Sequence, residues 1–203
     1  MSETKPKRGR PASIDKPAAL QSMVELFRSK GYAAVSLDDL SSVTGLSRPS
    51  LYRAFGNKVS MYLGAIDAFG VQVGREAAPQ LFASDSLKAD IANFLNAMLT
   101  IYYRDPEVTP GCLVFGTAPS AAEEAAIQAR LQFGVERVDA LMRSRFEQAA
   151  PAAEDALVQT AVEIASNTLI AFSARAKAGA PRSDLVEIGE RSASAISTLL
   201  GVA

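Results

Sequence analysis

The apolar positions beyond residue 70 recur at helical spacing, and this part of the sequence shows no alternation of the kind that strands produce. Short clusters of Pro, Gly and Asp separate the periodic segments. We expect five or six helices here, the clearest spanning residues 86–104, 112–118, 121–149, 153–178 and 183–201. The stretch between Leu157 and Phe172 is apolar nearly all round, which predicts a helix covered on every side.

Residues 31–58 predict two short helices that meet at a glycine, followed by a third helix. Ser36 is placed as the N-cap of the first, and Asp39 can complete a capping box. Gly45 supplies the positive φ that ends this helix. The apolar positions expected to face a core are Leu37, Leu40, Val43, Leu51 and Phe55. This spacing is typical of a helix-turn-helix unit that reads DNA.

The second short helix of this unit exposes hydroxyl, guanidinium and phenol groups and no carboxylate. Ser47 is its expected cap, and Pro49 falls in its first turn, where the missing N–H removes no hydrogen bond. Arginine can bind guanine with two hydrogen bonds, and hydroxyl groups can bind phosphates, so this face suits DNA. Asn57 is the expected cap of the third helix. The predicted DNA contacts are Arg8, Arg10, Ser36, Ser47, Arg48, Pro49, Ser50, Tyr52, Arg53 and Lys58.

The charge of the chain is divided unevenly, although its net value is only −1. Residues 1–58 hold ten Lys and Arg against five Asp and Glu, or +5, whereas the remainder holds 11 against 17, or −6. The basic part is therefore the part that contains the helix-turn-helix pattern. Before it, the segment Lys5–Pro11 concentrates four cations and predicts a flexible arm. Arg8 and Arg10 either enter the minor groove or belong to a solubilising tail.

Composition narrows the classes of function that remain. A chain of 203 residues that is 48% hydrophobic and 21% charged is ordinary for a globular protein. It has no apolar run long enough to span a bilayer and no apolar core of a signal peptide, which predicts a cytoplasmic protein without a membrane partner. One cysteine and no histidine leave out the usual metal sites and His-dependent nucleophile pairs. We expect no metal, no cofactor and no enzymatic activity.

From Ala18 to Phe69 the sequence resembles the DNA-binding domain of the TetR family of bacterial regulators. The segment ALQSMVELFRSKGYAAVSLDDLSSVTGLSRPSLYRAFGNK carries the LF…GY…S…L…G.S..SLY..F..K skeleton of that family almost without gaps. The segments GRPASID and PGCLVFGTA are similar to an AcrR-like branch. Val59 stands where the family usually has an acidic residue. Pro49 stands where Gly, Lys or Thr is common, so the base preference of the second short helix is open. The resemblance implies a homodimeric transcriptional regulator, most often a repressor, released from a palindromic operator by a small molecule.

The resemblance and the helical pattern together predict an all-α fold in three parts. These are a basic arm (1–15), a three-helix DNA-binding domain with the helix-turn-helix (16–58) and a helical domain for effector binding and dimerisation (59–203). The expected dimer contacts, from a four-helix bundle of the last two helices of each subunit, are Leu169, Phe172, Ile188, Ser192, Ile196 and Leu199. The small residues Gly189, Ala193 and Ala195 should let the helices approach closely. We also expect Arg137, Arg143 and Arg145 toward the solvated end of helix 121–149.

An apolar or aromatic effector is predicted from aromatic and sulfur-containing side chains in the middle helices. The candidates are Phe94, Met98, Tyr102, Tyr103, Cys112, Phe115, Phe133 and Asn167. The same residue types are also typical of a plain core, and Cys112 is either a buried hydrophobe or a redox sensor. Two other functions stay open at this point. A nucleoid-type architectural protein would bind many sequences nearly equally, and a helical enzyme would depend on carboxylates such as Glu123, Glu124 and Glu163.

Overall fold

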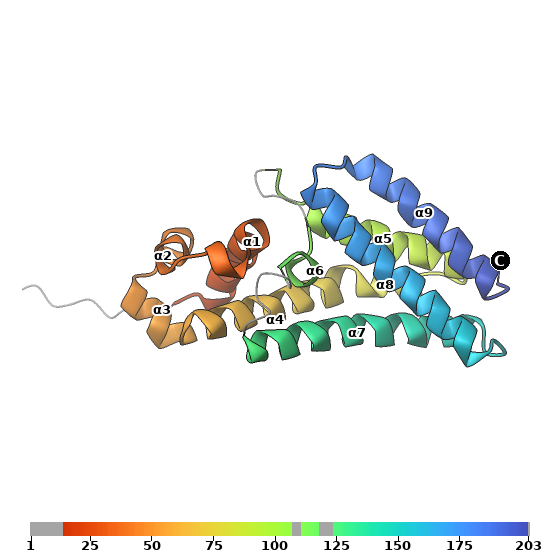
Figure 1. Cartoon of the computed structure of the whole chain (residues 1–203), viewed down its shortest axis with the longest axis horizontal. Coiled ribbons are helices and arrows are strands. Elements are labelled where there is room, and N and C mark those ends of the chain that lie inside the picture. The colour runs from red at the N-terminus through yellow and green to blue at the C-terminus, as the bar shows by residue number, and fades with distance from the viewer. Residues whose placement is uncertain (1–13, 107–110, 118–123, 203) are drawn as a thin grey trace, which may run out of the picture.

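The computed structural model describes residues 14–106, 111–117 and 124–202, and within them the chain is all helical (Figure 1). The fold class predicted from the sequence is therefore confirmed. The elements are α1 (Lys16–Ala34), α2 (Leu37–Thr44), α3 (Arg48–Phe55), α4 (Lys58–Glu76), the 3₁₀ helix η1 (Ala78–Phe82), α5 (Leu87–Tyr102), α6 (Leu113–Thr117), α7 (Ala125–Ala149), α8 (Asp155–Lys177) and α9 (Arg182–Leu199).

Helices α1, α2 and α3 form one end of the molecule around a small apolar core (Figure 1). Phe27 of α1 meets Tyr62 of α4 edge to face, with ring centroids 4.8 Å apart. Leu40 and Leu51 bring one fully buried side chain each from α2 and α3. Near its end α1 is interrupted at Gly31, whose φ of 78° is a conformation that glycine adopts without strain. The chain thereby turns toward α2.

Helix α4 runs lengthwise from this end into the rest of the molecule, with α7 alongside it (Figure 1). Asn57 caps α4 as predicted, since its side chain accepts a hydrogen bond of 2.8 Å from the Ser60 N–H. Met61, Tyr62 and Ala65 of its first half are fully buried. The first half of α4 thus belongs to the same core as α1, although the predicted domain boundary falls at its start. That boundary stays a prediction.

The other end of the molecule is built by α5, α8 and α9, which lie together in Figure 1. The buried apolar residues of α5 are Leu87, Ile91, Phe94, Leu95, Met98, Leu99, Ile101 and Tyr102. Gly189 of α9 sits against Phe172 of α8, where a Cβ atom would lie 3.3 Å from the phenyl ring. A hydrogen bond of 3.0 Å joins Thr168 of α8 to Ser192 of α9. Small residues here allow close packing within one chain.

Three expectations about exposure are wrong. Arg145 is not solvated but buried at 7% exposure, because Asp90 and the carbonyl oxygen of Leu81 accept its hydrogen bonds at 2.8–3.1 Å. Val43, placed in the core by helical spacing, is 42% exposed, because α2 is short and only Leu40 reaches the centre. Helix α8 is not covered all round, since Leu157 and Ile170 are 37% and 44% exposed.

Candidate nucleic-acid interface

The entry to the helix-turn-helix is fixed by a reciprocal pair of hydrogen bonds at the start of α2. The Ser36 hydroxyl accepts from the Asp39 N–H at 3.1 Å, and the Asp39 carboxylate accepts from the Ser36 N–H at 2.9 Å. Gly45 then ends α2 with φ of 68° and ψ of 9°. Both predictions are confirmed. Two orphan N–H groups are satisfied and the direction of the turn is set, so α3 has a defined orientation.

Helix α3 presents the predicted polar face to solvent. Arg48, Pro49 and Arg53 are exposed, Tyr52 is 48% exposed, and Ser50 is half-buried. Pro49 lies in the first turn as expected. Ser47 occupies the N-cap position, but its side chain does not cap the helix: the hydroxyl donates to the Ser50 hydroxyl at 3.0 Å instead. The Ser47 side chain therefore leaves the N–H groups at the start of α3 available to another acceptor.

Arg48 does not stand alone on this face. Its Nε and Nη2 donate to the two carboxylate oxygens of Asp38 on α2, at 2.7 and 2.5 Å. Both side chains are exposed, at 56% and 72%. These hydrogen bonds to the Asp38 carboxylate raise the pKa of the guanidinium above its usual value. The sequence placed no carboxylate within α3, but the fold brings one from the preceding helix.

Lys58 is held less freely than its place at the start of α4 suggested. Its ammonium lies 4.5 Å from the centre of the Tyr32 ring and donates to the Ala33 carbonyl oxygen at 3.5 Å. Partial desolvation lowers the pKa of this lysine. Its role as a phosphate contact stays a prediction that requires the side chain to leave the ring.

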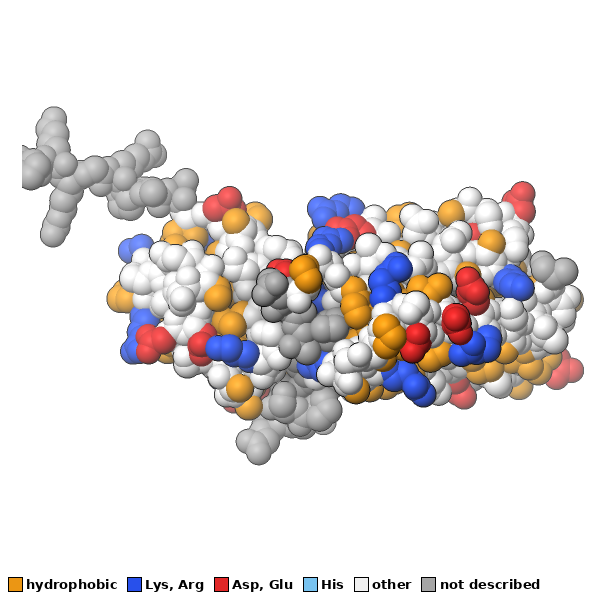
Figure 2. Space-filling view, turned by 90° about the horizontal axis from the view of Figure 1, so that it is seen from above, with side chains coloured by type: hydrophobic (Ala, Val, Ile, Leu, Met, Phe, Trp, Pro, Cys, Tyr) orange, Lys and Arg blue, Asp and Glu red, His pale blue; other side chains and the backbone are white. Residues whose placement is uncertain are grey.

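A second ion pair lies at the same end of the molecule. Lys30 donates to Asp39 at 2.6 Å, and this hydrogen bond, with those from Ser36, holds the pKa of the Asp39 carboxyl well below its ordinary value. Figure 2 shows Lys and Arg side chains at the surface of this end, with Asp and Glu beside them. The predicted contacts Arg8 and Arg10, and the basic arm that carries them, lie outside the described residues.

Arg28 counts toward the basic charge of the first 58 residues, yet it does not belong to the exposed face. It is only 2% exposed and lies where α1 meets the C-terminal end of α5. The guanidinium donates to the carbonyl oxygens of Tyr102 at 2.8 Å, Gly111 at 3.0 Å and Ile101 at 3.3 Å, and to the Glu25 carboxylate at 2.7 Å. A cation at a helix C-terminus is favourable, so Arg28 stabilises the joint between the two ends of the molecule.

The sequence did contain a signal for Arg28. Val24, Arg28 and Gly31 recur at helical spacing on the buried side of α1, so Arg28 occupies a core position in the pattern. An arginine at such a position has to find acceptors inside the protein.

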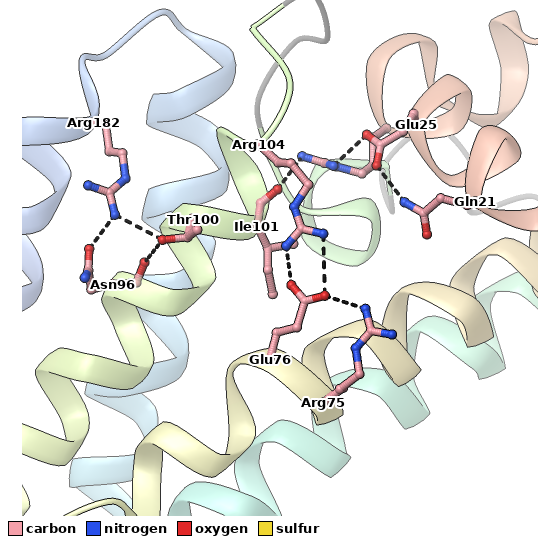
Figure 3. A network of polar contacts seen from close by, with 10 residues as sticks. Gln21, Glu25, Arg75, Glu76, Asn96, Thr100, Ile101, Arg104 and Arg182 are labelled. Atoms are coloured by element: carbon pink, nitrogen blue, oxygen red, sulfur yellow. Dashed lines mark hydrogen bonds and ion pairs between the residues drawn. The ribbon is translucent and has the colours of Figure 1, made fainter. Parts of the chain in front are cut away.

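Further polar contacts join the C-terminal end of α4 to the segment that follows α5, and the start of α9 to α5 (Figure 3). Glu76 lies between Arg75 and Arg104 and pairs with both. The hydrogen bond from Arg104 is the larger reason why the pKa of Glu76 is lowered. Arg182 donates to Asn96 at 2.6 Å and to Thr100 at 3.1 Å, both on α5. The contacts of Arg182 thus link the start of α9 to α5, whose last carbonyl oxygens accept hydrogen bonds from Arg28.

The eight predicted effector residues divide into two groups. Phe94, Met98, Tyr102 and Cys112 are buried at 2% exposure or less, and Tyr103 and Phe115 are half-buried. Phe133 is 49% exposed between Arg130 and Arg137, and Asn167 lies on the exposed side of α8. Both therefore lie apart from the buried candidates, and the effector role of all eight residues stays a prediction.

The buried candidates meet near the end of α5. The Cys112 N–H donates to the Ser173 hydroxyl at 3.0 Å, and burial raises the pKa of its thiol. The Tyr102 hydroxyl is buried without a hydrogen bond of good geometry among the described residues, and burial also raises its pKa. A separate cleft of about 110 Å³ lies between α5, α8 and α9, lined in part by Leu95, Leu99 and Phe172. The predicted effector residues do not line that cleft.

The predicted dimer residues also divide. Leu169, Phe172 and Ile196 have no exposed surface in the single chain, and their role as dimer contacts stays a prediction. They face inward because α8 and α9 pack on each other and on α5. Gly189 and Ala193 are buried for the same reason, whereas Ala195 is exposed. Ile188, Ser192 and Leu199 are half-buried and remain accessible.

Among the described residues, no group of three or more His, Cys, Asp and Glu is placed to hold a metal ion. In the same part of the chain, every helix is too short or too polar to cross a membrane.

A helix-turn-helix with an exposed cationic α3, mounted on a larger helical body, defines the class of helix-turn-helix transcriptional regulators. Residues 20–65 match the family model described as "Bacterial regulatory proteins, tetR family". This segment is therefore a DNA-binding domain of the TetR family, as the sequence predicted. Because this family consists of regulatory proteins, the prediction that the chain is not an enzyme is also confirmed. The assignment to an AcrR-like branch stays a prediction.

Similar proteins extend the comparison beyond the matched segment. The chain is 29% identical over 121 residues to the HTH-type transcriptional repressor ComR of Escherichia coli (strain K12), covering 59% of this chain and 57% of ComR. It is 35% identical over 71 residues to the HTH-type transcriptional repressor BdcR of the same strain, covering 35% of this chain and 34% of BdcR. These matches thus span little more than half, or less, of the relatives' own length.

A solved structure matches over nearly the whole chain. It is the TetR family transcriptional regulator CifR, a cysteine mutant complexed with a 26-bp double-strand operator DNA. It shares 27% sequence identity, covers 92% of this chain and 99% of its own, and superposes with a TM-score of 0.80. The likeness therefore includes the C-terminal helices as well as the helix-turn-helix.

Proposed function

We propose that this protein is a transcriptional repressor that binds a palindromic operator as a homodimer, with α3 in the major groove, and is released by a small apolar or aromatic effector. The observation that carries this proposal is the exposed face of α3, where Arg48, Tyr52 and Arg53 stand on a helix oriented by the α2 capping box. A regulator of this kind acts in the bacterial cytoplasm, where its DNA lies.

The relatives support the DNA partner and the sign of regulation. ComR and BdcR are named as repressors, and CifR is described in complex with operator DNA. A protein that reads DNA through one helix gains affinity and specificity by pairing two copies over successive major grooves. Dimerisation is therefore part of the proposal.

The exposed face of α8 and α9 is the surface that we propose for dimerisation. Ile170 on α8 is 44% exposed, and Ile164 on α8 is half-buried. On α9, Ile188, Ser192 and Leu199 are half-buried, and the bond between Thr168 and Ser192 shows where the two helices adjoin. Two such helices from each subunit can form an intersubunit four-helix bundle.

Release by an effector requires a path from the C-terminal helices to α3. The contacts of Arg28 provide one, because a guanidinium on α1 binds carbonyl oxygens at the end of α5 and at Gly111 just before α6. A ligand that displaced those carbonyls would alter the seating of α1, and with it the spacing of the two α3 helices. It can do so only by binding the released form more tightly.

The test is a mobility-shift titration of duplex DNA from the protein's own promoter region. Arg48→Ala and Tyr52→Phe should each weaken the shift, because each removes a group that faces the DNA. Arg75→Ala is the matched control: it also removes one exposed, ion-paired arginine, but at the end of α4, and should leave the shift unchanged. Wild-type protein that gives no salt-sensitive, sequence-dependent shift would contradict the proposal. Equal binding to all sequences would instead indicate an architectural protein.

A further inference from the structure

We propose that Asp38 is a specificity-determining positioning residue: it holds the Arg48 guanidinium in the orientation in which its free edge meets a guanine. This inference rests on the proposed function, because it assumes that α3 reads base edges. It assigns to an acidic residue of the preceding helix a role in the choice of operator sequence.

The hydrogen-bond donors of Arg48 carry the argument. A guanidinium has five N–H donors, one on Nε and two on each Nη. Asp38 accepts from Nε at 2.7 Å and from Nη2 at 2.5 Å, so it occupies one side of the planar group. The two N–H groups of Nη1 and the second N–H of Nη2 are not used by any hydrogen bond within the described residues. These remaining donors form the end of the fork, whose spacing matches O6 and N7 of guanine.

The position of Asp38 in the fold determines how the Arg48 guanidinium is oriented. Asp38 lies in the first turn of α2, between Leu37 and the capping residue Asp39. The backbone there is fixed by the reciprocal bonds of Ser36 and Asp39, and Lys30 holds the Asp39 side chain at 2.6 Å. The carboxylate of Asp38 is therefore presented from a rigid turn toward the start of α3. A free arginine side chain would sample many rotamers, and fixing it in advance lowers the entropy that binding costs.

The exposure of the pair argues against a purely structural role. With the two side chains 56% and 72% exposed, the pair is open to water and to screening by salt. Exposed ion pairs contribute little to folding. Asp38 also places a negative charge beside a surface proposed to bind phosphates, which opposes DNA binding in general. Asp38 thus contributes little to folding and opposes DNA binding in general. A role in discriminating between DNA sequences accounts for its presence at this position.

Loss of the Asp38 charge should change affinity and specificity in opposite directions. Asp38→Asn removes the negative charge and weakens the two-point hold on Arg48. Non-specific affinity should therefore rise, because repulsion of phosphates is relieved. The ratio of affinities for the preferred operator and for the same operator changed at one guanine position should fall by about 5- to 10-fold, since a bidentate arginine–guanine contact discriminates by at least that factor.

The experiment selects the preferred duplex from a random library with wild-type full-length protein and measures this ratio for four variants. They are Asp38→Asn, Arg48→Ala, the double variant, and Asp67→Asn as a control that removes another exposed, ion-paired aspartate. Thermal unfolding of each variant checks that it is folded. Asp38→Asn should lower the ratio at one base pair, the double variant should match Arg48→Ala alone, and Asp67→Asn should match wild type.

Two results overturn the inference while leaving the proposed function intact. One is an unchanged ratio for Asp38→Asn when the wild-type protein selects a clear sequence. The other is a loss of discrimination by Asp38→Asn that persists in the Arg48→Ala background, because Asp38 would then act independently of the arginine. If the wild-type protein selects no sequence at all, the proposed function itself fails and this inference fails with it.

Discussion

Arg28 of α1 donates a hydrogen bond of 2.8 Å to the backbone carbonyl oxygen of Tyr102, the last residue of α5. The two residues are 74 positions apart in the chain, and one belongs to the helix-turn-helix end while the other belongs to the C-terminal core. The bond joins the two ends through buried polar atoms. Its geometry gives the first prediction.

Arg28→Met should lower the free energy of unfolding by about 3 kcal/mol, because it leaves buried carbonyl oxygens without donors. Urea denaturation followed by circular dichroism measures this change. Arg75→Met, which removes an exposed arginine of α4, is the control and should cost less than about 1 kcal/mol. Equal effects of the two substitutions would show that the buried bonds of Arg28 contribute nothing special.

The buried ion pair between Asp90 and Arg145 gives a second prediction. Asp90 has no exposed surface, and its carboxylate accepts from Arg145 at 2.8 and 2.9 Å. Asp90→Ala should destabilise the fold by about 3–5 kcal/mol, because the arginine stays buried without its counter-charge. The double variant Asp90→Leu with Arg145→Met should be less destabilised than Asp90→Ala. If the single and double variants unfold at the same urea concentration, the uncompensated charge is not the cause.

The capping box of α2 predicts a dependence of stability on pH. Hydrogen bonds from Lys30 and Ser36 lower the pKa of Asp39 below its ordinary value of 3.8. The folded state therefore binds a proton less readily than the unfolded state, so this stabilisation is fully present above pH 3.8 and is lost as pH falls through the lower, folded pKa.

Thermal unfolding of Asp39→Asn and wild type, measured at intervals of about one pH unit from roughly pH 2 to pH 7, tests this expectation. The quantity compared is the unfolding temperature of the two proteins at each pH. The difference between the two proteins should be largest at neutral pH and should shrink in acid. A difference that stays constant over the whole range would mean that the charge of Asp39 does not support the cap.

Burial of Cys112 predicts a slow thiol. The raised pKa lowers the fraction of thiolate at any given pH, and the 2% exposure limits access of a reagent. Iodoacetamide at pH about 8 should modify Cys112 at least about tenfold more slowly in the folded protein than in urea, as followed by mass spectrometry. Equal rates in the two states would show that the segment around Cys112 opens readily.

The parts of the structure that the sequence predicted are those determined by neighbours along the chain. The capping box of Ser36 and Asp39 and the turn at Gly45 depend on residues within ten positions, so their spacing suffices. The burial of Arg145 depends on Asp90, 55 positions away, and such long-range partners leave no local pattern. The same limit applies to the proposed site.

The candidate interface shows this division within a single helix. The exposed side of α3 follows from the period of Leu51 and Phe55, but the carboxylate that pairs with Arg48 comes from α2. Phe133 has the aromatic ring that is typical of a pocket residue, and only the packing of α7 reveals that it is exposed. Residue type and spacing thus predict which face is polar, whereas the arrangement of charges on it requires the fold.

The central claim is that this chain reads a specific DNA sequence as a dimer through α3. It is tested most directly by titrating a fluorescent duplex from the protein's own promoter region, and a scrambled duplex of equal composition, at physiological salt. We predict a ratio of affinities on the order of 10³ or more, with two chains bound per specific site. A ratio near one would contradict the account.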